Sequence, residues 1–119
     1  MEVILLDSIL TSIKKLLGIP ETYTNFDDDI IIQINSAFAA LNQIGVGPFG
    51  GYMIEGKDNI WDDYITSCNL QMVKTYIHLK VKMVFDPPTS AALIEATERA
   101  IAELEWRLYL EGDYKEGGE

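Results

Sequence analysis

Apolar residues recur at the spacing of one helix face in four long stretches of this chain, with glycines and prolines between the stretches. The first stretch ends at Gly18 and the second at Gly45. The third ends at 86–88, Asp-Pro-Pro, because proline disfavours helix at the residue before it and lacks a backbone donor. The fourth begins near Thr89 or Ser90, either of which can cap a helix. The pattern predicts a mainly α, four-helix domain.

The predicted helix over about 69–85 is apolar on two sides. A helix of this kind is either buried centrally or shared with another subunit, so its second stripe is a candidate interface. The first stripe consists of Leu70, Val73, Ile77, Val81 and Val84, and the second consists of Met72, Tyr76, Leu79 and Met83.

Most of the non-helical signal lies between the second and third long helices. Here a glycine-rich loop leads into the residues YMIEGKDNIW, which predict a short strand, a polar turn and a return, that is, a small β-hairpin. A short helical turn is expected at 61–64. Apolar side chains on a mobile loop suggest a segment that docks on another molecule. The candidates in this loop are Phe49, Tyr52, Met53 and Ile54.

Residues 45–50, GVGPFG, match the dinucleotide-binding pattern G-x-G-x-x-G. A true dinucleotide loop follows a strand and opens a helix, whereas here a helix precedes the motif and a predicted strand follows it. Pro48 also removes a backbone donor where the phosphates need one. No Lys-Ser or Lys-Thr pair follows, which excludes a P-loop. We therefore interpret the motif as a hinge and expect no cofactor.

Residues capable of catalysis or metal binding are few. Cys68 and His78 lie ten positions apart on or beside one helix, about 15 Å along its axis, which is beyond the reach of a nucleophile and its base. The aspartates at 27–29 and 62–63 could gather a metal, but 27–29 suit a helix N-terminus better. We expect no enzyme activity and no metal site, and we expect Trp61 and Trp106 to anchor the core.

Basic residues form one row on the third long helix, at Lys74, His78 and Lys82. Two interpretations remain open for this row. It is either a solvated face or an electrostatic surface that meets acidic groups on a neighbouring copy, such as the outer face of the last helix.

The formal net charge of −10 disfavours binding to nucleic acid, because such binding depends on neutralising phosphates. The charge can serve solubility or a specific function. No apolar run reaches membrane-spanning length and no signal peptide is evident, so we expect a soluble cytosolic protein. A chain of 119 residues fits one domain, predicted over 1–111, with a flexible polar tail over 112–119.

With these segments placed, nearly the whole chain resembles the small head-tail connector proteins of tailed bacteriophages and prophages, also called head-completion or adaptor proteins. The order and spacing of several blocks carry the resemblance. These blocks are LLDSILTSIKKLLGI, FDDDIIIQINSAFAALNQIGVGP, Trp61, VKTYIHLKVKMVFDPP and ELEWRL at 103–108.

The resemblance implies a helical subunit of a closed ring, dodecameric in the virion, between the portal at the capsid vertex and the next connector or the tail. Such a ring bounds the channel through which genome DNA passes without specific binding. The family implies a location in the virion, with assembly in the host cytoplasm, and gives no named functional residues. Two alternatives remain: an acidic soluble regulator or DNA mimic that binds a basic protein, and a small hydrolase using Cys68 or His78.

Overall fold

The computed structural model describes residues 8–64 and 69–117, with side chains described as far as Leu110. This part of the chain is mainly helical, as predicted, but contains five helices rather than four because the short turn at 61–64 is a helix of its own. The helices are α1 (Ile9–Leu17), α2 (Asp27–Gln43), α3 (Trp61–Tyr64), α4 (Leu70–Phe85) and α5 (Ala91–Gly117).

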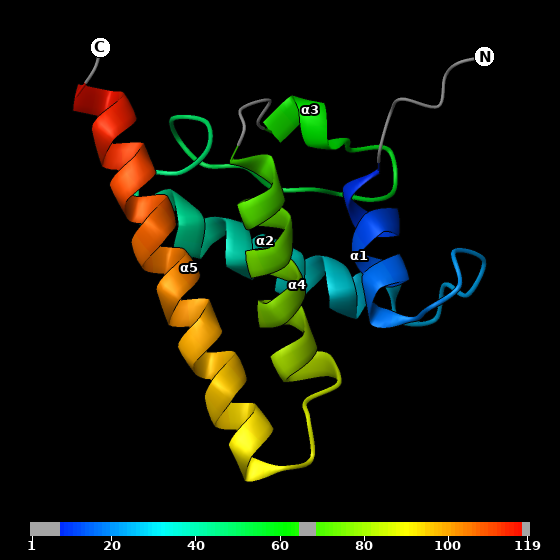
Figure 1. Ribbon diagram of the computed structural model, residues 1–119. Coiled ribbons are helices and arrows are strands. Elements are labelled where there is room, and N and C mark those ends of the chain that lie inside the picture. Colours follow the sequence, from blue (N-terminus) through cyan, green and yellow to red (C-terminus); the bar gives the residue numbers. More distant parts are fainter. Residues whose placement is uncertain (1–7, 65–68, 118–119) are drawn as a thin grey trace.

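Helix α4 lies at the centre of the fold and packs against α1, α2 and α5. Figure 1 shows α4 and α5 side by side and antiparallel, with their short connection at the bottom of the view, while α2 crosses behind α4 and α1 lies at the right. One continuous core runs through these contacts. Its largest fully buried side chains include Trp61, Tyr76, Phe38, Ile13, Ile34 and Leu108.

Local capping interactions set several helix ends, and those at Gly18 and Ser90 lie where the sequence predicts them. The Ser8 hydroxyl accepts a hydrogen bond from the Thr11 N–H at 3.2 Å, and Gly18 ends α1 in the left-handed conformation with φ of 81°. At α5, the Ser90 hydroxyl accepts from the Leu93 N–H at 3.0 Å. Ser90 is therefore the cap of the last helix.

The predicted β-hairpin is wrong: the described residues between α2 and α3 contain no strand, only an isolated bridge between Ser8 and Ile60. A side-chain amide replaces the partner strand. The Ile54 N–H donates to Asn35 Oδ1 at 2.8 Å, and Asn35 Nδ2 donates to the Ile54 carbonyl at 3.0 Å. The Asn59 side chain accepts from the Glu55 N–H at 2.8 Å. These bonds satisfy the backbone without a ladder.

Gly47 is the glycine of this segment that approaches a side chain most closely. Its φ is +99°, and a Cβ added there would lie 2.6 Å from Cε1 of Tyr64. The Tyr64 ring is itself held against Phe38, with 4.5 Å between the ring centroids. A side chain at position 47 would therefore have to displace a packed aromatic ring.

We expect Gly47→Ala to lower the free energy of unfolding by about 2–3 kcal/mol, through left-handed backbone strain and the clash with Tyr64. Gly50→Ala is the matched control, because Gly50 has φ of +95° but nothing within 4 Å of an added Cβ. It should cost only about 1 kcal/mol. Urea unfolding of both variants measures the difference. Equal losses would contradict the close contact with Tyr64.

Helix α5 continues to Gly117 and so runs through most of the 112–119 segment predicted as a flexible tail. Its last turns are formed by residues 111–117, EGDYKEG, a polar sequence without apolar periodicity. The helical backbone of 112–117 is the part of that segment that the structure describes. The division into a domain over 1–111 and a tail stays a prediction.

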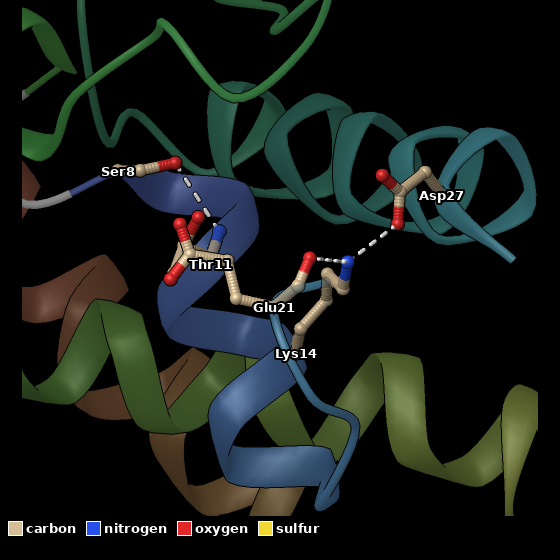
Figure 2. A network of polar contacts seen from close by, with 5 residues as sticks. All are labelled: Ser8, Thr11, Lys14, Glu21 and Asp27. Atoms are coloured by element: carbon tan, nitrogen blue, oxygen red, sulfur yellow. Dashed lines mark hydrogen bonds and ion pairs between the residues drawn. The ribbon is translucent and has the colours of Figure 1, made fainter. Parts of the chain in front are cut away.

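A buried ion pair fixes the connection between α1 and α2 (Figure 2). Lys14 is only 2% exposed, and its Nζ lies 2.8 Å from Asp27 Oδ1. The same ammonium group donates to the Glu21 carbonyl at 3.0 Å. A single lysine from α1 thus binds both the α1–α2 connection and the start of α2.

Candidate assembly surfaces

The apolar residues predicted on the 45–60 segment divide into exposed and buried ones. Phe49 is fully exposed and Met53 is 67% exposed, so both side chains are available to another molecule. Ile54 is buried at 1% exposure and belongs to the core. Tyr52 is half-buried and packs edge-on against Phe38, with the ring centroids 5.2 Å apart. We call Phe49 and Met53 the loop surface.

Aromatic packing supports the loop surface from beneath. Tyr52 packs against both Phe38 of α2 and Tyr64 of α3, which also contact each other, and its ring centroid is 5.3 Å from that of Tyr64. Burial raises the pKa of Tyr64 well above its usual value, which keeps its phenol neutral. The segment between α2 and α3 is therefore anchored by Tyr52 and Ile54 while Phe49 and Met53 point away from the core.

The second apolar stripe of α4 faces inside the fold more than the sequence suggests. Tyr76 is fully buried, and its hydroxyl donates to Glu105 Oε2 of α5 at 2.6 Å. Met72, Leu79 and Met83 are half-buried. Helix α4 is apolar on two sides because it is the central helix and packs against both α2 and α5.

The basic row on α4 has interactions within the chain at each position. Lys74 Nζ lies 5.3 Å from the ring centroid of Trp61, in a cation–π arrangement. Lys82 pairs with Asp86 at 3.4 Å, and His78 is half-buried. The three residues share one side of α4, as their spacing predicts. Whether they also meet a neighbouring copy stays a prediction.

His78 has a buried Nε2 atom without a hydrogen-bond partner in the described structure. Burial lowers the pKa of His78 below the ordinary 6.5, and the positive charge of Lys82 lowers it further. A hydrogen bond with the Leu16 backbone raises the pKa but does not cancel these two effects. The folded chain therefore binds a proton at His78 less readily than the unfolded chain does.

This shift predicts a pH-dependent loss of stability. Above pH 6.5, the pKa of His78 in the unfolded chain, the imidazole is neutral in both the folded and the unfolded chain, and the protein has its full stability. As the pH falls through 6.5, the unfolded chain takes up the proton first. The free energy of unfolding therefore declines. Urea unfolding at several pH values between about 7.5 and 5.5 measures the decline. His78→Gln should decline less than the natural chain over this window. Parallel pH profiles of the two proteins would contradict the prediction.

The expectation that Trp106 anchors the core is wrong, because its side chain is 59% exposed. Trp61, in contrast, is buried as expected. Trp106 stacks on Tyr109, with the ring centroids 6.0 Å apart, and Leu110 is also exposed on this part of α5. We call Trp106, Tyr109 and Leu110 the α5 patch. Three large apolar side chains exposed together on one helix are typical of a contact surface.

A groove lies where α2, α4 and α5 meet, with a cavity volume of about 330 Å³. Its lining is mixed: four residues are apolar (Ala37, Met83, Val84 and Ile101), two are uncharged and polar (Gln33 and Ser36), and two are charged (Lys80 and Glu98). Val84 is 62% exposed although it continues the first stripe of α4. We call this hollow the α2–α4–α5 groove.

The described residues hold no candidate for a metal-binding cluster or a membrane-spanning helix. No group of three or more His, Cys, Asp or Glu residues there could hold a metal ion, and none of the helices is long and apolar enough to cross a membrane. Cys68 lies outside the described residues, so its distance from His78 stays a prediction.

The family model described as "Phage connector protein" matches residues 9–115, which span α1 to near the end of α5. The chain belongs to the phage connector family. The resemblance predicted from the sequence blocks is thereby confirmed. No curated protein and no solved structure matches this connector.

Family membership gives the connector a structural role in a phage particle, and makes it a component of the virion. A structural family favours this role over the acidic-regulator and hydrolase alternatives. The loop surface and the α5 patch are exposed in the single chain.

Proposed function

We propose that this connector assembles with copies of itself into a closed ring at the capsid vertex. The ring joins the portal protein to the next connector or to the tail, and it bounds the channel through which the genome leaves. The observation that carries the proposal is the pair of exposed apolar surfaces, one with Phe49 on the loop and one with Trp106 on α5. A small domain with a complete core has no internal use for them.

A closed ring of identical chains needs a heterologous contact, in which one face of each copy meets a different face of the next. It also needs contacts along the ring axis to other proteins of the particle. Two separate apolar surfaces on one chain match these needs. The loop surface, Phe49 and Met53, rests on anchored residues and so can present its side chains without unfolding the domain.

The charge of the chain fits a channel for DNA. With a formal net charge of −10, the ring repels the phosphate backbone on average, so the genome passes without binding. The connector is thus expected to bind its protein neighbours and not nucleic acid.

Negative-stain electron microscopy of the connector mixed with portal rings tests this function. The expected result is an additional ring of density on one end of the portal, absent from portal rings alone. Portal rings that look the same with and without the connector, at concentrations where both proteins are in excess of several micromolar, would contradict the proposed role.

A further inference from the structure

The α5 patch is a projecting apolar surface, and the α2–α4–α5 groove is a hollow partly lined by apolar side chains. The patch projects two stacked aromatic rings, Trp106 and Tyr109, from the surface of a helix. The groove is a hollow of about 330 Å³ whose lining includes four apolar residues beside four polar or charged ones. Trp and Tyr are the side chains that most often anchor a protein contact by filling a pocket on the partner.

A chain cannot fill its own groove with its own patch. Ile101, which lines the groove, and Trp106 belong to the same continuous helix and lie five residues apart. Five residues place the two side chains roughly 140° apart around the axis and about 7.5 Å apart along it. Because the patch and the α5 residues that line the groove are fixed on one continuous helix, the patch cannot fold back into the groove of its own chain, and a second copy can supply the occupant.

Charged side chains next to both surfaces suit contact with a second copy of this acidic chain. Glu103 and Arg107, which pair at 2.9 Å, flank Trp106 on α5. Lys80 and Glu98 line the groove. Each surface thus has one acidic and one basic side chain beside it, so Glu103 and Arg107 can exchange their mutual pair for pairs with Lys80 and Glu98 of the second copy, despite the net charge of each copy.

We infer that the α5 patch of one connector docks in the α2–α4–α5 groove of the next copy around the ring. This contact rests on the proposed ring function and assigns the two unlike faces that such a ring needs. A stable contact buries about 800 Å² on each partner, more than three side chains provide. The patch is therefore the anchor of the contact, and the surrounding surface of α4 and α5 completes it.

Two variants remove one face each and leave the core intact. Trp106→Ala removes the anchor, and Val84→Glu places a charge among the apolar residues of the groove. Both positions are more than half exposed, so the fold tolerates the change. Each variant should self-associate at least about thirtyfold more weakly than the natural chain. Leu93→Ala is the control, since Leu93 is 58% exposed on the same helix but belongs to neither surface.

Mixing the two variants gives the sharpest result. The Trp106→Ala chain keeps its groove and the Val84→Glu chain keeps its patch, so the mixture contains one intact contact and should form a one-to-one dimer that grows no further. Sedimentation velocity of the full-length proteins, alone and with portal rings, measures these species. Circular dichroism confirms that each variant is folded.

The other outcomes separate this inference from the ring itself. Variants that assemble as the natural chain does would overturn the inference and leave the ring in place. Loss of assembly in Trp106→Ala alone, with Val84→Glu unaffected, would also overturn it, because the patch would then meet another surface. If both variants are folded and monomeric but form no dimer on mixing, the inferred contact between patch and groove is also overturned. A natural chain that stays monomeric even with portal rings would contradict the proposed function.

Discussion

Trp61→Ala is expected to lower the free energy of unfolding by about 3–5 kcal/mol, the usual loss when a fully buried tryptophan is truncated. Trp61 is 1% exposed and joins three helices. Its Nε1 donates to the Ser12 hydroxyl of α1 at 3.1 Å, and Lys74 of α4 lies over its ring at 5.3 Å. Truncation leaves a cavity at this junction and removes both polar contacts.

Thermal and urea unfolding at low protein concentration measure the loss, and Trp106→Ala is the matched control. Trp106 is 59% exposed, so its truncation should change the stability of the isolated chain by less than about 1 kcal/mol. A domain of this size has about 5–15 kcal/mol of stability in total, so the Trp61 variant should melt far below the natural chain. Similar losses for the two tryptophans would contradict the assignment of one to the core and the other to the surface.

Lys14→Met is expected to cost about 2–3 kcal/mol, less than the loss of a fully buried ion pair because the Asp27 side chain is 23% exposed. Methionine keeps the apolar stem of the lysine, so the cost comes from the unpaired Asp27 carboxylate and the unbonded Glu21 carbonyl. Urea unfolding measures it.

The double variant Lys14→Met with Asp27→Leu separates the cost of leaving Asp27 unpaired from the contribution of the ion pair itself. Removing the second charge should recover part of the stability, because no buried carboxylate then lacks a partner. A single Lys14 variant within about 0.5 kcal/mol of the natural chain would show that the pair in Figure 2 contributes little to holding α1 and α2 together.

The helices could be predicted because their ends depend on neighbouring residues. Gly18 and Ser90 act within one turn of the helices they end or begin, so their effects are visible in a short window of sequence. The ion pairs on the outer face of α5 are equally local: Glu95 with Arg99 at 4.0 Å, and Glu103 with Arg107 at 2.9 Å, join residues four positions apart.

The loop between α2 and α3 could not be predicted in the same way. Its apolar alternation fits a strand, but the groups that pair with Ile54 belong to Asn35, nineteen residues earlier on α2. No pattern within the loop indicates that a side-chain amide will replace a partner strand. The backbone conformation there depends on tertiary structure.

Of the two surfaces, the α5 patch could be predicted in part from the sequence and the α2–α4–α5 groove could not. Trp106 lies two residues from both Leu104 and Leu108, which belong to or pack against the core, and positions two apart on a helix point to different sides. This spacing indicates exposure, whereas the residue type alone favours burial. The α2–α4–α5 groove has no such signal, because its lining comes from three helices that meet only in the folded chain.

The mass of the natural connector in solution, measured by light scattering with and without portal rings, tests the ring most directly. The account predicts a closed multimer of one defined size, either with the connector alone or once portal rings are added, with no larger open species at higher concentration. A connector that keeps the mass of a single chain, 13.4 kDa, under both conditions would contradict it.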